Sequence, residues 1–178
     1  MSDFDALVRR FERPLLRYAA RIIGDEERSR DVVQDVFVQL QIRLKEQHSE
    51  VSAKWLFTVC RNRALNLCRK DRRLAFIRDD DSIFAVEKDE QTPVEQLERE
   101  EANDFLMRIV ATLPPRQQEV LQLRFQNDLS YREIGEIIGL TATHVGVLIH
   151  NALHLLRRQY QRSASEFISV GLPQSDKL

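Results

Sequence analysis

The feature that most constrains the fold is a helical repeat of apolar residues along most of the chain. Between residues 4 and 22, apolar side chains recur at three- and four-residue steps: Phe4, Leu7, Val8, Phe11, Leu15, Tyr18, Ala19 and Ile22. Such steps gather side chains on one face of an α-helix. The spacing returns in residues 32–44 and 53–68, and no stretch alternates for long enough with the period of two that a strand requires. The sequence therefore predicts an all-α protein.

The N-terminal part has clear breaks between its helices. Pro14 lacks an amide donor, so we expect it to kink or restart the first helix. Gly24-Asp25 ends that helix, and Asp25 suits the N-terminus of the next one. After a polar connector, a third helix runs from about Ala53 to Arg73, and Trp55 is assigned to the core on its apolar face.

Charge is separated along the chain, although the net charge is only −1. Residues 61–78 contain seven basic and one acidic residue, whereas residues 79–104 contain two basic and eleven acidic ones. The basic residues lie on the polar face of the third predicted helix. The helical period is lost before Thr92-Pro93 and returns at about Val94, so we interpret residues 76–93 as a flexible acidic linker. An alternative, that it mimics nucleic acid and shields the basic helix, stays open.

Residues 127–141 have the pattern of a helix-turn-helix. Ser130 and Glu133 form a capping box at the start of the first helix. The small Gly135 permits close helix approach, and Gly139 stands where the turn needs a left-handed residue. Ile134, Ile137 and Ile138 are expected to face inward. An ordinary αα-hairpin is the structural alternative.

The second helix of this motif has an unusual opening. It is capped by Thr141 or Thr143 and is expected to end at Arg157-Arg158. In a DNA-reading helix-turn-helix its first two turns enter the major groove. Here those turns carry Thr143, His144, Gly146, Val147 and Asn151, with no Arg or Lys before Arg157. Direct base readout normally uses Arg, Lys, Asn or Gln, so the chemistry for it is sparse.

Four motifs follow one another along the chain. They are Asp31-Val-Val-Gln34-Asp35-Val-Phe37, Lys54–Asn66 (KWLFTVCRNRALN), Leu113–Leu121 (LPPRQQEVL) and Leu129–Ile134 (LSYREI). In this order and spacing they resemble the sigma factors of bacterial RNA polymerase, and the chain length resembles the extracytoplasmic-function (ECF) group. The resemblance covers about Phe4–Arg73 and Val94–Gln161. It implies sigma region 2 in residues 1–75, an acidic linker in 76–93, sigma region 4 in 94–162 and a C-terminal tail in 163–178.

The resemblance also implies a function. Such a protein binds core RNA polymerase and directs promoter-specific transcription initiation, while the polymerase performs the catalysis. The helix containing Asp31, Gln34 and Asp35 is implied to dock on the polymerase, and acidic and amide groups suit a basic partner surface.

Promoter contacts are implied for two further surfaces. At the −10 element, Asn62 and Asn66 would read bases and basic residues would hold phosphates; the full set is Arg61, Asn62, Arg63, Asn66, Arg69, Lys70, Arg72 and Arg73. At the −35 element the candidates are Ser130, Tyr131, Arg132, Thr143, His144, Val147, Asn151 and Arg157. The sequence departs from the family pattern at His144–Leu148. This leaves shape readout, phosphate anchoring or a protein partner such as an anti-sigma factor as alternatives for that helix.

Other classes of function find little support. The sequence has no Gly-rich phosphate loop and no metal-ligand cluster, and His150 and His154 would make only half a metal site. We expect no cofactor and no small-molecule substrate, and we interpret Cys60 and Cys68 as buried or half-buried thiols. No apolar run approaches the ~20 residues of a membrane helix, so we expect a cytoplasmic protein without membrane insertion. Two alternatives stay open, a sigma-like adaptor and a stand-alone helix-turn-helix regulator.

Overall fold

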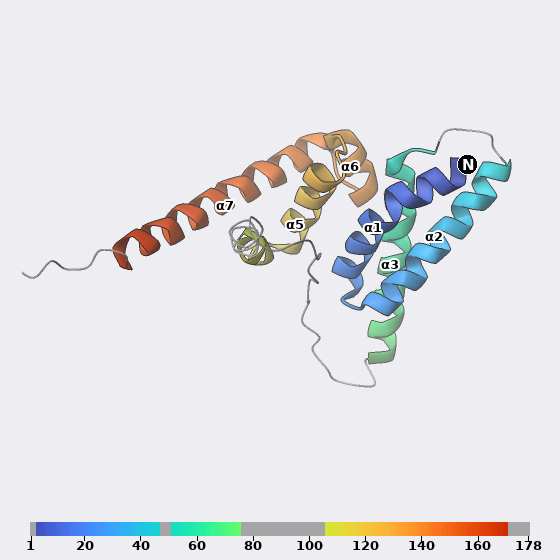
Figure 1. The fold of residues 1–178 in the computed structure, drawn as a ribbon, viewed down its shortest axis with the longest axis horizontal. Helices are drawn as coiled ribbons and strands as arrows, with labels where there is room; N and C mark the ends of the chain where they lie inside the picture. The colour runs from blue at the N-terminus through green and yellow to red at the C-terminus, as the bar shows by residue number, and fades with distance from the viewer. Residues whose placement is uncertain (1–2, 47–50, 76–105, 171–178) are drawn as a thin grey trace, which may run out of the picture. The chain divides into compact units, whose positions relative to one another are not determined.

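The computed structural model describes residues 3–46, 51–75 and 106–170, and no strand occurs among them (Figure 1). The helices are α1 (Asp3–Ile23), α2 (Glu26–Glu46), α3 (Ala53–Ala75), α5 (Pro115–Leu121), the π-helix η1 (Gln122–Gln126), α6 (Tyr131–Ile138) and α7 (Ala142–Val170). Residues 106–111 are helical as well. The all-α prediction is therefore confirmed. The predicted linker, residues 76–93, lies outside the described residues.

The chain forms two compact units. The first comprises Met1–Lys88 with Gln122–Ala142, and the second comprises Asp89–Leu121 with Thr143–Leu178. In the first unit, α1, α2 and α3 pack on one another as a three-helix bundle (Figure 1). Its fully buried apolar side chains are Leu15, Tyr18, Ala19, Val36, Leu40, Leu56, Phe57, Cys60 and Ala64.

The core of the bundle includes Phe57 of α3. Phe57 is completely buried, and its ring meets that of Tyr18 edge-on with centroids 5.4 Å apart. Trp55, which the sequence places in the core, is only half-buried, and the Arg43 guanidinium lies over its ring, 5.0 Å from the centroid. The core assignment of Trp55 was wrong. The side chains of α3 that face the core are those of Leu56 and Phe57, so Trp55 lies at the edge of the buried face.

Asp25 caps the start of a helix, whereas Pro14 lies within one. The α2 N-terminus is capped as predicted, because the Asp25 carboxylate accepts a hydrogen bond from the Arg28 amide at 2.9 Å. Pro14, in contrast, does not restart the first helix, since α1 continues through it. Phe11 and Leu15 are buried on either side of Pro14. Packing of both halves of α1 on the same core offsets the hydrogen bond that proline cannot donate.

Polar contacts also tie the three helices together. Arg28 near the start of α2 forms an ion pair with Asp71 near the end of α3 at 2.7 Å, and this hydrogen bond raises the pKa of the guanidinium. The Cys60 thiol donates to the Leu15 carbonyl at 3.9 Å, and burial raises its pKa to about 12. Cys68 is half-buried, with its sulfur 3.4 Å from the Ile22 carbonyl.

The second unit is organised around the long helix α7. Val145, Ile149 and Ala152 of α7 are buried, and the Thr112 hydroxyl donates to the Gln159 amide oxygen at 3.0 Å. The predicted end at Arg157-Arg158 was wrong, since α7 continues to Val170 and takes up the first part of the expected tail. No glycine or proline occurs between Arg158 and Gly171, so nothing in that sequence stops the helix.

In residues 3–46, 51–75 and 106–170, no single helix is both long and apolar enough to cross a bilayer. Only a bent pair, Tyr131–Ile138 with Ala142–Arg162, reaches the required length and composition when taken together.

Candidate nucleic-acid interface

One exposed face of α2 carries the predicted docking residues. Asp31, Gln34 and Asp35 are all exposed, while Val32, Val33 and Val36 between them are buried against the other helices. The 3.6-residue period of the helix places the three polar side chains together and turns the valines inward. The result is a solvated acidic and amide strip.

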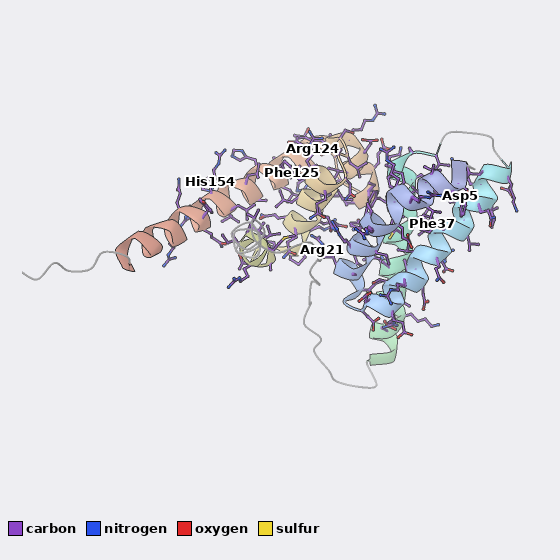
Figure 2. All side chains as sticks on the ribbon, in the orientation of Figure 1. Asp5, Arg21, Phe37, Arg124, Phe125 and His154 are labelled. Atoms are coloured by element: carbon purple, nitrogen blue, oxygen red, sulfur yellow. The ribbon has the colours of Figure 1, made fainter. Side chains whose placement is uncertain are left out.

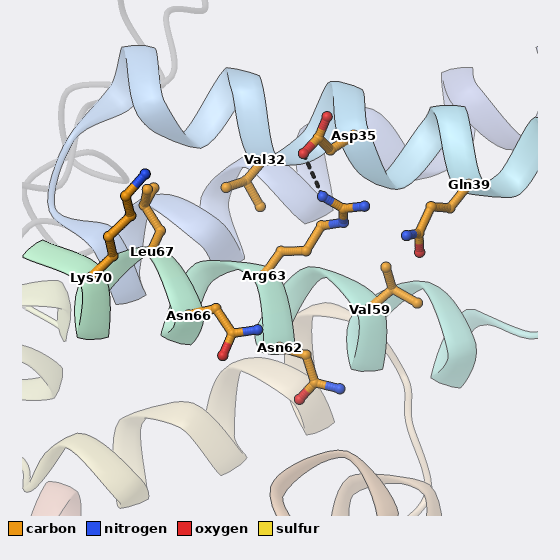
Figure 3. Close-up of a pocket in the computed structure, with 9 residues that line it drawn as sticks. All are labelled: Val32, Asp35, Gln39, Val59, Asn62, Arg63, Asn66, Leu67 and Lys70. Carbon is orange, nitrogen blue, oxygen red and sulfur yellow. Dashed lines mark hydrogen bonds and ion pairs between the residues drawn. The ribbon is translucent and has the colours of Figure 1, made fainter.

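The third helix presents two amides side by side. Asn62 and Asn66 are exposed and lie one helical turn apart on the same side of α3, pointing away from α2 (Figure 3). The Asn66 amide oxygen accepts a hydrogen bond from Arg69 at 3.5 Å. An amide has both a donor and an acceptor, as the edges of nucleic-acid bases do, so this pair is suited to reading unpaired bases.

Basic residues surround these amides. Arg69 and Lys70 are exposed, and Arg61 and Arg63 are half-buried. The side chains of Arg72 and Arg73 lie outside the described residues. The polar face of α3 and the adjoining face of α2 line an open groove of about 550 Å³ (Figure 3). Its lining residues are Val32, Asp35, Gln39, Val59, Asn62, Arg63, Asn66, Leu67 and Lys70.

An ion pair crosses this groove between residues expected to meet different partners. Arg63 of α3 donates to the Asp35 carboxylate of α2 at 2.5 Å (Figure 3). The Arg63 side chain is 34% exposed and that of Asp35 is 59% exposed, so solvent reaches both groups. The pair was not expected from sequence, because the two residues stand 28 positions apart and only the packing of α2 on α3 makes them neighbours.

The capping box of the helix-turn-helix forms as predicted. The Ser130 hydroxyl accepts from the Glu133 amide at 3.3 Å, and the Glu133 carboxylate accepts from the Ser130 amide at 2.8 Å. The Ser130 hydroxyl also donates to that carboxylate at 2.6 Å, which holds the pKa of Glu133 below its ordinary value. Both ends of one helical turn are thereby fixed at the start of α6.

The turn that follows α6 depends on two glycines. Gly139 has a φ of 74°, in the left-handed region that glycine adopts most easily. At Gly135 a Cβ atom would lie 2.5 Å from the Leu140 carbonyl oxygen, closer than any side chain tolerates. The Leu140 amide returns to the Gly135 carbonyl at 2.9 Å. Ile134, Ile137 and Ile138 are buried, as expected.

The candidate recognition residues of α7 are exposed. The exposed set is Thr143, His144, Val147, Asn151 and Arg157. Because α7 begins at Ala142, Thr141 stands at the capping position and Thr143 lies in the first turn. Val147 is 51% exposed, an apolar side chain at a position where a base-reading helix would present a polar one.

A π-helix precedes the motif and brings in a residue that sequence reasoning missed. Arg124 and Phe125 belong to η1 (Figure 2), and Arg124 donates to the Leu129 carbonyl at 3.0 Å. Its guanidinium also lies over the Tyr131 ring at 5.6 Å. Tyr131 therefore carries a cation on its face, which adds to the basic character of Arg132 beside it. No periodic signal could have found Arg124, because a π-turn is out of phase with the apolar repeat.

Among the residues that the structure describes, no group of three His, Cys, Asp or Glu side chains could hold a metal ion. His150 and His154 are exposed on α7, one turn apart.

The chain is similar to proteins of one family in both halves. The model described as Sigma-70 region 2 matches residues 7–74, and that described as Sigma-70, region 4 matches residues 109–158. The ECF RNA polymerase sigma factor SigL of Mycobacterium tuberculosis is 30% identical, over 83% of this chain and 82% of its own length. RNA polymerase sigma factor YlaC of Bacillus subtilis is 27% identical, over 93% and 96%.

A solved structure agrees in fold. The sigma factor RpoE of Bartonella quintana, crystallised in complex with the anti-sigma factor NepR, matches with a TM-score of 0.68 at 18% identity. The match covers 90% of this chain and 98% of that one.

Proposed function

The chain belongs to the ECF group of RNA polymerase sigma factors, and from this premise we propose how its surfaces divide the work of initiation. A sigma factor binds core RNA polymerase and directs it to promoters. We assign polymerase docking and −10 recognition to residues 1–75 and −35 recognition to residues 94–162, with the acidic stretch 76–93 as tether.

Docking rests on the exposed strip of α2. Asp31, Gln34 and Asp35 meet a basic surface of the polymerase, where complementary charge speeds encounter and fixes register. The observation that carries the proposal is that this strip and the amide-bearing face of α3 belong to one three-helix bundle. Core enzyme and the −10 element then engage the same rigid body.

Contact with the −10 element belongs to the polar face of α3. Asn62 and Asn66 read the edges of unpaired bases, and the basic residues of the same helix hold phosphates: Arg61, Arg63, Arg69 and Lys70. Arg72 and Arg73 extend the same basic run in sequence. Phosphate contacts release counterions, so this part of the affinity falls steeply as salt rises.

Recognition of the −35 element uses anchoring more than base readout. Two sets of side chains share this role. Phosphates are anchored by Ser130, Tyr131 and Arg132 at the start of α6 and by His144 and Arg157 of α7. The major groove of the DNA is faced by Thr143 and Asn151. The exposed Val147 supports a second candidate function, that of a sigma-like adaptor which docks on polymerase but reads the −35 element weakly.

Exposed apolar side chains on α7 also favour a protein partner. Val147 and Leu153 are 51% and 38% exposed. We infer an anti-sigma factor as that partner, in line with the complex in which the Bartonella RpoE was solved. We infer further that the protein acts in the cytoplasm and has no catalytic activity of its own, because the polymerase makes the RNA.

Run-off transcription from fragmented genomic DNA of the source organism tests the proposal. Core polymerase is compared with and without the full-length protein. New discrete transcripts are expected, and their aligned upstream sequences will show whether α7 selects a −35 sequence. Co-elution with core but no transcripts would favour the adaptor. Neither transcripts nor co-elution would contradict both and leave a stand-alone DNA-binding regulator.

A further inference from the structure

The Asp35–Arg63 ion pair joins two residues that the proposed function gives to different partners. We propose that this pair couples the two binding events: in the free chain Asp35 holds Arg63, and docking of core polymerase on Asp35 releases Arg63 for a DNA phosphate. The inference rests on the proposed function, because it requires that Asp35 faces the polymerase and that Arg63 lies in the DNA-binding face.

The direction of the Arg63 side chain sets it apart from the neighbouring polar residues of α3. Asn62 and Asn66 point away from α2, whereas Arg63 crosses the groove to Asp35 (Figure 3). A guanidinium facing a carboxylate at 2.5 Å has its charge partly compensated. Its attraction for a phosphate is therefore weaker than that of an uncompensated cation on the same helix.

Docking would reverse this compensation. A basic group of the polymerase that approaches Asp35 supplies the positive charge that Arg63 provides in the free chain. Arg63 then turns toward solvent, where its side chain is already one-third exposed. Thermodynamic linkage requires the reverse effect as well, so that DNA bound at Arg63 strengthens docking at Asp35 by the same factor.

The expected size of the coupling is modest. Ion pairs between solvent-exposed groups contribute little, which limits the effect to about two- to fivefold in affinity. That is enough to favour DNA binding by the assembled holoenzyme over binding by the free factor.

The chain offers matched controls for both partners. Asp31 is an exposed carboxylate one turn before Asp35 on the same strip, and the structure gives it no ion pair in the described part of the chain. Asp31→Asn therefore removes the same charge as Asp35→Asn without releasing a guanidinium. Arg69 is an exposed cation on α3 that contacts the Asn66 amide, so Arg69→Ala removes the same charge as Arg63→Ala without exposing a carboxylate.

The first experiment measures binding of the full chain, without polymerase, to a mixed-sequence single-stranded oligonucleotide by fluorescence anisotropy over a series of salt concentrations. Asp35→Asn should tighten binding about two- to fivefold. It should also steepen the slope of log K against log salt by up to about one, the change expected from one additional phosphate contact. Asp31→Asn should tighten it less, and Asp35→Asn combined with Arg63→Ala should abolish the gain. Equal gains for Asp31→Asn and Asp35→Asn would overturn the coupling.

The second experiment measures binding to core polymerase in the absence of DNA. Arg63→Ala should tighten docking about two- to fivefold, because Asp35 loses its internal partner, whereas Arg69→Ala should leave it unchanged. No difference between these variants would also overturn the coupling, while wild-type core binding and transcription would keep the proposed function intact. A wild-type chain that bound neither core nor oligonucleotide would remove the proposed function itself.

Discussion

The α2–α3 face and the helix-turn-helix achieve their surfaces in different ways. On α2 and α3 the surface is made by side-chain chemistry: carboxylates, amides and guanidinium groups stand out from a bundle whose core is complete without them. In the helix-turn-helix the surface depends on backbone geometry. The capping box at Ser130, the left-handed Gly139 and the close approach at Gly135 determine where α7 begins.

This difference separates binding chemistry from folding. Substitutions on the exposed face of α2 or α3 should change partner affinity and leave the free energy of unfolding almost unchanged, since surface changes usually lie within about ±0.5 kcal/mol. Substitutions at the turn of the helix-turn-helix should do the opposite. The four predictions below test that separation, in order of decreasing effect.

The largest effect is expected from reversing charge on the α2 strip. Asp35→Lys combined with Gln34→Ala places a cation against a basic polymerase surface, which should weaken core binding by about 2–4 kcal/mol. Titration of core polymerase with labelled protein measures this. The melting temperature serves as the control and should stay near that of the wild type. Unchanged core affinity would remove the docking assignment, and a large loss of stability would break the comparison.

The helix-turn-helix should respond most to a methyl group at Gly135. Gly135→Ala puts a carbon 2.5 Å from the Leu140 carbonyl oxygen, so the backbone must shift and stability should fall by about 1–3 kcal/mol. Urea unfolding followed by circular dichroism measures the loss. Gly139→Asn is the matched control, because its Cβ would meet nothing within 4 Å and Asn tolerates the left-handed region. Gly139→Asn should lower the free energy of unfolding by less than Gly135→Ala does. A larger loss at Gly139 would contradict the claim that the contact with the Leu140 carbonyl oxygen causes the destabilisation.

On α3 the amides should matter for promoter opening. Asn62→Ala removes one base-reading group and should reduce open-complex formation about tenfold, with a smaller effect on closed-complex binding. Permanganate footprinting and gel-shift assays on one promoter separate the two steps. Arg69→Ala, the control, should weaken binding to all sequences and lower its salt dependence. Equal loss of open and closed complexes for Asn62→Ala would count against base reading.

The smallest effect concerns the cap of α6. Ser130→Ala should cost about 1 kcal/mol, because the Glu133 amide loses its acceptor. The same serine holds the pKa of Glu133 below its ordinary value. This contribution is fully present above the unfolded-state pKa, at about pH 4.3, and is lost as the pH falls through the lower folded-state pKa.

Melting curves at neutral and acidic pH measure this dependence. Glu133→Gln keeps a side chain that can complete the capping box but cannot titrate, so its stability should lack this acid-dependent part. If Glu133→Gln and the wild type lost equal stability on acidification, the titration of Glu133 in the capping box would not explain the acid-dependent loss.

Much of the fold could be predicted because local signals agreed with the tertiary structure. The start of α2 at Asp25, the capping box at Ser130 and the turn at Gly139 are each encoded within a few residues of sequence. The burial of Ile134, Ile137 and Ile138 follows from the helical period alone. Pro14 does not end α1, because burial on both sides of it outweighs the local cost of the missing hydrogen bond.

The candidate site was less predictable, since it depends on which helix faces which. Exposure of Asp31, Gln34 and Asp35 could be read from the valines between them, but the partner of Arg63 could not. That contact depends on how α2 packs on α3. The apolar period shows which face of each helix is buried, but it does not show which residues of the two helices become neighbours. The π-turn that places Arg124 over Tyr131 has no distinct periodic signal either.

The two thiols of the bundle have a practical consequence. Cys60 is buried with a pKa of about 12, so almost none of it is the reactive thiolate near neutral pH. Cys68 is half-buried on α3, between Asn66 and Arg69. A maleimide dye added to the folded wild-type protein should therefore react at Cys68 and spare Cys60. The chain thus contains its own attachment point for a fluorescent reporter beside the residues that we assign to promoter contact, without an engineered cysteine.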